Sequence, residues 1–334
     1  MATTLKDIAD RLRVSPSTVS RALSDTGRVS KETRARVLRV AEELGYVPNA
    51  LARGLAGAST NIVGCVILEL SNPFFAPLVQ AIEDVADERG YVAIVSQSKR
   101  QVELEKRLTD RFRRIKVDGV IMTPLLQSFD HLEALKADGM PLISVGRRCE
   151  RLDYVVVDDR QGAHLVGQHL IRLGHRSIGT LMSGEPYNNA EGDRLAGLHR
   201  FLEQAGLPYR EEWTFRVGNN RIEGGIVGAE SWLSMSEKPS AVFALNDMLA
   251  LGFIHRVRQR GIKVPGDLAV VGFDDVPFAK FSEVALTTVA YPKYEMGRIA
   301  AEMLFNRIGN RDKVRKIEHI LLQPELVIRQ SCGG

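Results

Sequence analysis

The chain has few cysteines and no long apolar run. Only three of its 334 residues are cysteine, and Cys65, Cys149 and Cys332 are odd in number and far apart. This is typical of a protein in a reducing cytoplasm rather than one held by disulfides. No run of eighteen apolar residues occurs, so we expect no membrane-spanning helix. The first twenty residues carry Asp7 and Asp10 and no apolar central segment, so we expect no signal peptide.

Motifs of cofactor-dependent and hydrolytic enzymes are also missing. No Gly-x-Gly-x-x-Gly turn follows the apolar run that ends at Leu68, which disfavours a dinucleotide-binding enzyme. No Gly-x-Ser-x-Gly elbow accompanies Ser96 or Ser183, which disfavours a hydrolase. The seven histidines are scattered and form no metal pair with cysteine or carboxylate. We therefore expect no enzymatic activity, no cofactor and no metal.

The charge of the chain is concentrated at one end. An apolar content of 44% and a charged content of 26% are ordinary for a globular protein, and 334 residues allow two or three domains. Residues 1–60 contain ten Lys or Arg and six Asp or Glu, whereas the remaining residues contain equal numbers of each sign. The whole excess of +4 therefore lies in the first sixty residues, and contacts with the phosphates of a nucleic acid require positive charge of this kind.

Two short amphipathic segments at the N-terminus predict a helix-turn-helix. The second begins at Ser15, a good N-cap, and Pro16, which suits the first helical position because proline lacks the N–H that would be unpaired there. Ser17, Thr18 and Arg21 then lie on its outer face, where they would enter a DNA major groove. A small helical cap on a larger fold is the alternative. Apolar residues at helical spacing line each segment: Ile8, Ala9 and Leu12 in the first, and Val19, Ala22 and Leu23 in the second.

A third helix and a marginal fourth one follow. Ser30 caps a helix over residues 31–44, with Val37, Leu38, Ala41 and Leu44 as its buried stripe and Gly45 at its end. Asn49 can cap a further helix of two turns, which is too short to be stable alone and is weakened by Gly54. We therefore assign residues 1–46 to the helix-turn-helix domain and residues 47–60 to a hinge helix and linker.

From residue 61 onward apolar strands alternate with helices. Such a pattern predicts parallel sheets covered on both faces, and about ten strand–helix units are too many for one open sheet. We therefore expect an α/β core of two doubly wound lobes, behind an all-α N-terminal domain. The first lobe takes about 61–158 plus 290–318, and the second about 159–289 plus 319–334. Ligands of such folds bind at the carboxyl ends of the strands, so the cleft between the lobes is the expected site.

At this point the sequence resembles the LacI/GalR family of bacterial transcriptional repressors over essentially its whole length. The matching segments occur in the family's order, and together they are highly specific. They are Leu5-Lys6-Asp7-Ile8-Ala9, residues 15–23 (SPSTVSRAL), residues 45–55 (GYVPNALARGL), Ser71-Asn72-Pro73-Phe74-Phe75, Val117-Asp118-Gly119-Val120-Ile121, Gly174-His175-Arg176, Arg194-Leu195-Ala196-Gly197, Asn246-Asp247 and Val271-Gly272-Phe273-Asp274-Asp275.

The resemblance implies a repressor that binds a pseudo-palindromic double-stranded operator as a homodimer or a dimer of dimers in the cytoplasm. Its core resembles periplasmic sugar-binding proteins, which implies a small sugar-like effector, either inducer or corepressor. In the family the hinge helix folds on DNA and drives a leucine between base pairs. The residues implied to contact DNA are Ser15, Pro16, Ser17, Thr18, Arg21, Tyr46, Asn49, Ala52 and Leu55. The alternatives are a solvated charge for Arg21, packing for Tyr46 and a core position for Leu55.

The resemblance also implies an effector site at the strand ends. Adjacent hydroxyls of a sugar need bidentate polar partners, and an aromatic ring covers its apolar face. Arg194 could instead form an ion pair that braces the lobes, Phe74 and Phe75 could be packing residues, and Asp158 is favoured as a helix cap. The implied effector residues are Asn72, Phe74, Phe75, Thr123, Arg147, Arg194, Asn220, Asn246, Asp274 and Tyr291.

Two positions depart from the family pattern. Asn220 stands where family members often carry an aromatic ring, and the fourth strand of the core ends in Gly146-Arg147 where Asp-Arg is frequent. Compared with the Asp-Arg of the family, Gly146-Arg147 lacks the carboxylate and keeps the cation. Such a pocket could accept an anionic ligand, such as a sugar acid or a sugar phosphate. A solute-binding protein or a sugar-acting enzyme with the same two-lobed core is the alternative function, which the basic helices and the absent signal peptide disfavour.

Overall fold

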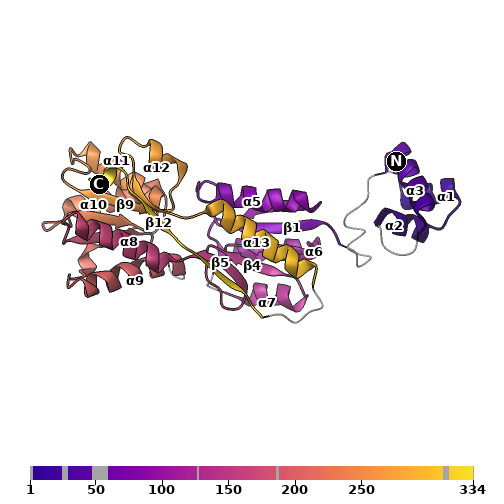
Figure 1. Cartoon of the computed structure of the whole chain (residues 1–334), viewed down its shortest axis with the longest axis horizontal. Helices are drawn as coiled ribbons and strands as arrows, with labels where there is room; N and C mark the ends of the chain where they lie inside the picture. The colour runs from indigo at the N-terminus through magenta and orange to yellow at the C-terminus, as the bar shows by residue number, and fades with distance from the viewer. Residues whose placement is uncertain are drawn as a thin grey trace. The chain divides into compact units, whose positions relative to one another are not determined.

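The computed structural model describes residues 3–24, 29–46, 59–125, 128–185, 188–310 and 316–333 (Figure 1). The chain divides into two compact units, Met1–Thr60 and Asn61–Gly334. Within the described ranges, no helix is both long enough and apolar enough to cross a membrane.

The described residues of the first unit form three helices, α1 (Leu5–Leu12), α2 (Pro16–Ser24) and α3 (Lys31–Glu43). Side-chain caps fix where they begin. Thr4 and Asp7 form a capping box on α1, Ser15 Oγ accepts the Thr18 N–H at 3.1 Å at the start of α2, and Ser30 caps α3. The predicted start of the second helix at Pro16 is confirmed, because the serine supplies an acceptor for a backbone N–H that has no partner within the helix.

One apolar cluster holds these three helices together, and it corrects one detail of the sequence analysis. Leu38 is 47% exposed, so it is not part of the buried stripe of α3. Val40 packs against the cluster instead, because residues 37, 40, 41 and 44 share one helical face and residue 38 is turned away from it. The buried members are Ile8, Ala9, Val19, Ala22, Val37 and Ala41.

The second unit begins with a six-stranded parallel sheet, the first lobe. Its strand order is β11-β5-β4-β3-β1-β2. Helices α5 and α13 pack against each other, and α13 also contacts β3, β4 and β5. The strands are β1 (Ile62–Ile67), β2 (Val92–Gln97), β3 (Gly119–Met122), β4 (Leu142–Val145), β5 (Asp153–Val157) and β11 (His319–Leu322), and the helices are α5 (Phe75–Glu88), α6 (Val102–Arg114), α7 (Asp130–Ala137) and α13 (Lys293–Ile308).

The second lobe is another six-stranded sheet, in the order β12-β10-β9-β8-β6-β7, parallel except for the β10–β12 pair. Helices α8 and α9 pair with each other, as do α10 and α11. The strands are β6 (Ile178–Met182), β7 (Thr214–Arg216), β8 (Ala241–Ala244), β9 (Ala269–Phe273), β10 (Thr287–Ala290) and β12 (Glu325–Val327), and the helices are α8 (Asp159–Arg172), α9 (Asn189–Gln204), α10 (Ile222–Ser234), α11 (Asp247–Gln259) and α12 (Pro277–Phe281), with 3₁₀ turns at Glu211–Trp213 and Gln330–Cys332.

The chain passes between the lobes three times: between β5 and α8, between β10 and α13, and between β11 and β12. The third passage corrects the expected lobe boundary. Residues 319–322 form β11, which pairs with β5 in the first lobe, so the second lobe resumes only after Leu322. The sequence could not place this boundary, because β11 and β12 are strands of four and three residues on the outer edges of the two sheets. The predicted architecture of two doubly wound lobes behind a helical N-terminal unit is confirmed.

Candidate functional site

The outer face of α2 presents small polar groups and one cation. Ser15, Pro16, Ser17 and Arg21 are exposed, and Thr18 is half-buried. The Ser15 hydroxyl lies 2.7 Å from that of Ser17 and 2.8 Å from that of Thr18, so the cap and the first turn form one hydrogen-bonded group. These side chains share a solvent-facing helical surface, which is the arrangement that base-edge contacts in a major groove require.

The other residues implied to contact DNA fall near the end of the first unit. Tyr46 is half-buried and packs against the apolar cluster of that unit. Its aromatic body thus has a packing role. Asn49, Ala52 and Leu55 lie outside the residues that the structure describes.

All ten residues implied to bind an effector line a single cavity in the second unit. They come from both lobes, although they are separated by more than two hundred positions in sequence. Asn72, Phe74, Phe75, Thr123 and Arg147 follow or begin elements of the first lobe, whereas Arg194, Asn220, Asn246 and Asp274 belong to the second, and Tyr291 lies where the chain passes between them. The cavity therefore lies at the cleft between the lobes, at the carboxyl ends of their strands.

A buried ionic cluster forms the wall of this cavity on the side of the second lobe. The Arg194 guanidinium lies 2.7 Å from Asp159 and 3.4 Å from Asp274, and it stacks on the Phe273 ring at 3.6 Å from the ring centroid. Burial raises the pKa of Asp159 to about 6, against the opposing effect of Arg194. Arg194 thus forms ion pairs within its own lobe, and it does not brace one lobe against the other through these two contacts.

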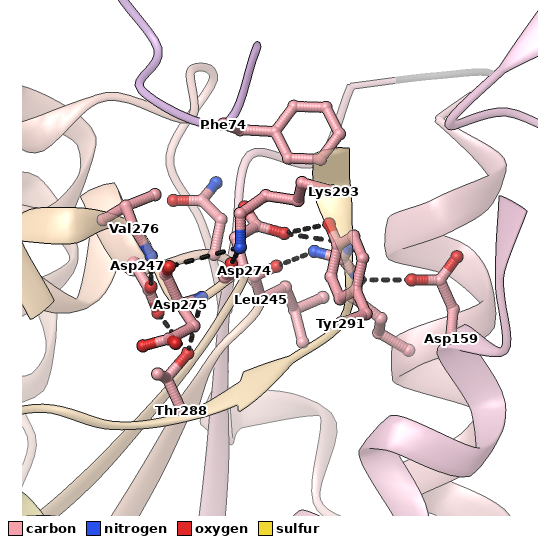
Figure 2. Close-up of polar contacts among 12 residues, drawn as sticks. Phe74, Asp159, Leu245, Asp247, Asp274, Asp275, Val276, Thr288, Tyr291 and Lys293 are labelled. Carbon is pink, nitrogen blue, oxygen red and sulfur yellow. Dashed lines mark hydrogen bonds and ion pairs between the residues drawn. The ribbon is translucent and has the colours of Figure 1, made fainter. Parts of the chain in front are cut away.

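Asp274 is held by several elements at once (Figure 2). Tyr291 donates its hydroxyl to Asp274 Oδ1 at 2.9 Å, and the Asp274 N–H donates to Val289 O at 2.9 Å. Burial raises the pKa of the Asp274 carboxyl, while Arg194 and Tyr291 act in the opposite direction. A buried carboxylate fixed in this way is a preorganised acceptor for ligand hydroxyl groups.

The backbone of this loop is in an unusual conformation that its neighbours support. Asp274 has φ +112° and Asp275 φ +48°, in a region that L-residues other than Asn and Asp seldom adopt. Figure 2 shows Asp247 between Val276 and Thr288: it accepts the Val276 N–H at 2.8 Å and the Thr288 hydroxyl at 2.5 Å. Gly272 leaves room for this carboxylate, because a Cβ there would lie 2.2 Å from Asp247 Oδ1.

The first lobe contributes an aromatic wall and a buried cation. The Phe74 ring lines the cavity, with its centroid 6.2 Å from that of the Tyr291 ring, and it contacts Phe75 edge-on at 4.7 Å. Phe75 is also part of the main apolar core, so it has a packing role as well. Arg147 is 4% exposed, and its guanidinium donates to Pro124 O at 3.2 Å. Burial, and then repulsion from Arg100, lower the pKa of Arg147 to about 10.

Two amide side chains of the cavity have structural partners. Asn246 caps α11 by accepting the Leu249 N–H at 2.8 Å, and Asn72 Oδ1 accepts the Phe74 N–H at 3.0 Å. The amide nitrogens of these two residues are therefore the groups left for other contacts. Asn220 is half-buried and replaces the expected ring by a short polar group. The prediction that Asp158 is a helix cap is confirmed, since it accepts the Gln161 N–H at 3.0 Å at the start of α8.

Sequence reasoning missed several residues of the cavity wall, chiefly Arg100, Asp159 and Glu191. Asp159 was detectable, because it follows Asp158 directly at the end of a strand. Arg100 lies three residues beyond β2, outside the strand ends from which site residues are predicted. Glu191 is almost completely buried and accepts the Ser183 hydroxyl at 2.8 Å, a contact with no signature in sequence.

Two buried polar atoms of the wall, Thr123 Oγ1 and Arg100 Nε, have no hydrogen-bond partner among the described residues. A buried donor or acceptor without a partner is costly, so a polar ligand would be stabilised there. The described residues contain no group of His, Cys, Asp and Glu that could hold a metal ion. The wall is that of a binding site for a small polar molecule.

Two independent features thus define the class of protein: a helix-turn-helix unit with a polar outer helix face, and a two-lobed core with a polar cleft. Residues 4–49 match the family model "Bacterial regulatory proteins, lacI family", and residues 167–332 match "Periplasmic binding protein-like domain". The chain is 36% identical to the HTH-type transcriptional regulator DegA of Bacillus subtilis (strain 168), over 100% of this chain and 99% of that protein.

Two solved structures resemble the chain over nearly its whole length. The complex of the transcriptional regulator CelR with cellobiose is 31% identical, with a TM-score of 0.75, over 98% of this chain and 99% of that one. The lac repressor dimer bound to operator and the anti-inducer ONPF is 26% identical, with a TM-score of 0.84, over 99% of both chains. The chain belongs to the lacI family: it is a DNA-binding transcriptional regulator and not an enzyme.

Proposed function

We propose that this regulator is a cytoplasmic repressor whose operator affinity is controlled by a sugar-like effector in the cleft between its lobes. The observation that carries the proposal is the cavity wall. Side chains from both lobes converge there, with buried carboxylates on one side and the Phe74 ring lining the cavity. Buried carboxylates can accept hydrogen bonds from the hydroxyl groups of a sugar, and the Phe74 ring can cover the apolar face of the sugar ring. The effectors named with two relatives, cellobiose and ribose, agree with this chemistry.

The proposed operator contacts divide by role. Ser17, Thr18 and Arg21 contact base edges in the major groove, because they share the solvent-facing side of α2. Ser15, Pro16 and Tyr46 contact the backbone or thymine methyl groups and set the register. Asn49, Ala52 and Leu55 supply the hinge contacts, with Leu55 inserted between base pairs from the minor groove.

A homodimer, or a dimer of dimers, would place two such helices on the two halves of a pseudo-palindromic operator. One helix-turn-helix reads a short half-site, and twofold symmetry of the protein matches twofold symmetry of the DNA. The effector then acts by linkage, because it binds one arrangement of the lobes more tightly than the other. Linkage is reciprocal, so the effector changes operator affinity by the same factor by which the operator changes effector affinity.

The side of the cavity near Arg147 favours an effector with an acidic group. No carboxylate of a described residue forms an ion pair with Arg147, and its pKa is lowered by burial and by Arg100. Three carboxylates further off are engaged elsewhere: Glu185 with Arg100, Glu191 with Ser183, and Glu105 with the Leu125 N–H and His131. A sugar acid or sugar phosphate would give Arg147 a counter-ion, which a neutral sugar does not.

The experiment that tests the proposal is an operator titration with and without effector. Sugars, sugar acids and sugar phosphates are first screened by thermal shift, and the ligand that raises the melting temperature is studied by calorimetry. Operator DNA is selected from random duplexes and titrated by fluorescence anisotropy. We expect a steep fall of affinity with salt, as phosphate contacts require, and a shift of affinity when the ligand is added.

A ligand that leaves operator affinity unchanged would contradict control by the cleft. Tight binding of a neutral sugar, with none of any acidic one, would contradict the role given to Arg147.

A further inference from the structure

Arg100 connects the two lobes across the mouth of the cleft. It belongs to the first lobe, three residues after β2, and its guanidinium lies 2.5 Å from Glu185, which follows β6 in the second lobe. Its Nε lies 3.9 Å from Glu69 of its own lobe, and Glu69 also pairs with Arg221 of the second lobe. The four side chains form a network that crosses the cleft twice, which we name the latch (Glu69, Arg100, Glu185, Arg221).

The Arg100–Glu185 pair is the most buried of three ion pairs that described residues form between the lobes. The two side chains are 15% and 21% exposed. In the Arg221–Glu69 pair the arginine is 58% exposed, and in a third pair between the lobes, Arg148–Asp193, the arginine is 39% exposed. Exposed ion pairs are screened and contribute little, whereas partly buried ones are screened much less. Among these three ion pairs, Arg100–Glu185 is therefore the one whose separation costs most.

The backbone that presents Arg100 is itself unusual. Residues 98–101 form a tight turn, closed by the Gln101 N–H donating to Ser98 O at 2.9 Å. Its two central residues, Lys99 and Arg100, have φ +50° and +58°, a conformation that Gly and Asn adopt readily and that Lys and Arg seldom do. Strain of this kind is kept where the surrounding structure and the function require it. The turn fixes the direction of the Arg100 side chain towards the cleft.

The latch also reaches the effector cavity. Arg100 lines that cavity, and its Nε is buried with no hydrogen-bond partner among the described residues. Glu69 remains beside the guanidinium within the first lobe, so the cation keeps a counter-charge when Glu185 moves away. The pair can therefore break and re-form without leaving Arg100 uncompensated.

We propose that Arg100 is a positioning residue that keeps the lobes closed through Glu185 in the absence of effector, so that the latch sets how readily the cleft opens. This rests on the proposed function only in treating the cavity as the effector site. Its consequence for regulation is direct: loss of the latch lowers effector affinity, because the ligand must then close the lobes as well as bind.

The test measures the distance between the lobes in full-length protein without effector or DNA. Spin labels are placed on Ala137→Cys in α7 and Arg200→Cys in α9, both exposed positions, and the three native cysteines are buried. Labelled chains are diluted with unlabelled protein so that double electron–electron resonance reports distances within one chain. Because neither operator nor effector is present, failure of the proposed function and failure of the latch are distinguishable.

A charge exchange isolates the pair. We expect Arg100→Glu and Glu185→Arg each to move most of the distance distribution to longer values, and the double variant to return at least half of it. Arg210→Glu is the matched control, since Arg210 pairs with Glu237 at 2.8 Å on the surface of the second lobe alone; it should leave the distribution unchanged.

Three results would overturn the proposal: a wild-type distribution already centred at the long distance, single variants with the wild-type distribution, or a double variant as open as the singles. Circular dichroism checks that each variant is folded. If Arg100→Glu does not fold, the neutral cycle of Arg100→Gln, Glu185→Gln and the double variant replaces it. The double should then be no more open than either single, and additive opening would contradict the pair.

Discussion

The Tyr291 hydroxyl donates a hydrogen bond to Asp274 Oδ1 at 2.9 Å, and this contact joins a passage between the lobes to the cavity wall. Tyr291 follows β10 immediately, where the chain leaves the second lobe, and Asp274 follows β9. Both side chains are buried. A ligand that breaks this hydrogen bond, by taking the place of either partner, would therefore act directly on the segment that connects the two lobes.

Replacement of Tyr291 by Phe tests this contact. The ring and its packing against Phe74 and Phe273 remain, but the buried Asp274 carboxyl loses a donor. We expect the free energy of unfolding to fall by about 1–3 kcal/mol, the usual cost of leaving a buried polar group with fewer partners. Urea unfolding measures it. Full stability in the variant would show that solvent or Arg194 satisfies Asp274 equally well.

The pH dependence of stability tests the burial of Asp159. Its pKa is raised from 3.8 to about 6 by burial, so between these values the native protein holds a proton that the unfolded chain has released. Stability from this group is therefore present below about pH 4 and declines as the pH rises to about 6, by roughly 3 kcal/mol for two pKa units. The free energy of unfolding is measured for wild type and for Asp159→Asn from pH 4.5 to 7. As the pH rises, the wild-type value should fall relative to that of Asp159→Asn, which has no carboxyl group to titrate at this position. Parallel curves would contradict the raised pKa.

Replacement of Gly272 by alanine tests whether Asp247 supports the loop that contains Asp274. A Cβ at this position would lie 2.2 Å from Asp247 Oδ1 and 2.9 Å from Leu286, both in the closely packed interior. We expect Gly272→Ala to lower the free energy of unfolding by about 1–3 kcal/mol through overpacking, and to weaken effector binding because Asp247 supports residues 275–276. Gly266→Ala is the control, since Gly266 is exposed and the nearest atom to its added Cβ is Lys263 Cβ, at 3.3 Å rather than 2.2 Å. Equal stability of the two variants would contradict the tight fit.

Leu55 tests the hinge predicted from sequence. If Leu55 is the proposed apolar wedge, Leu55→Ala removes it, and we expect specific operator binding to weaken by ~2 kcal/mol or more while effector binding is unchanged. A gel-shift series with a selected operator measures the first, and calorimetry the second. Unchanged operator affinity would rule out the wedge.

Much of this architecture could be predicted from local signals. The start of α2 was predictable because Ser15 and Pro16 each satisfy a specific requirement of a helix N-terminus. The alternation of strands and helices predicted the two lobes, because continuous apolar strands separated by amphipathic helices leave few other arrangements. The ten implied cavity residues were within reach because the ends of parallel strands meet at one edge of each sheet.

What the sequence did not reveal depends on contacts between distant segments. The placement of β11 in the first lobe is decided by pairing with β5, more than 150 residues earlier. Arg100 reaches Glu185 only because a strained turn directs it into the cleft, and no local pattern marks that turn. Leu38 was misassigned because an apolar residue at the edge of a helical stripe can face either way until the packing partner is known.

The most direct test of the account is the coupling between cleft and operator in one protein. Operator affinity is measured by fluorescence anisotropy at increasing concentrations of the ligand found by thermal shift, and ligand affinity by calorimetry with and without saturating operator. The account predicts that the two coupling factors agree, as linkage requires, and that Asp274→Asn abolishes ligand binding and the shift while ligand-free operator binding remains. Coupling that persists in Asp274→Asn, or ligand binding with no effect on operator affinity, would contradict it.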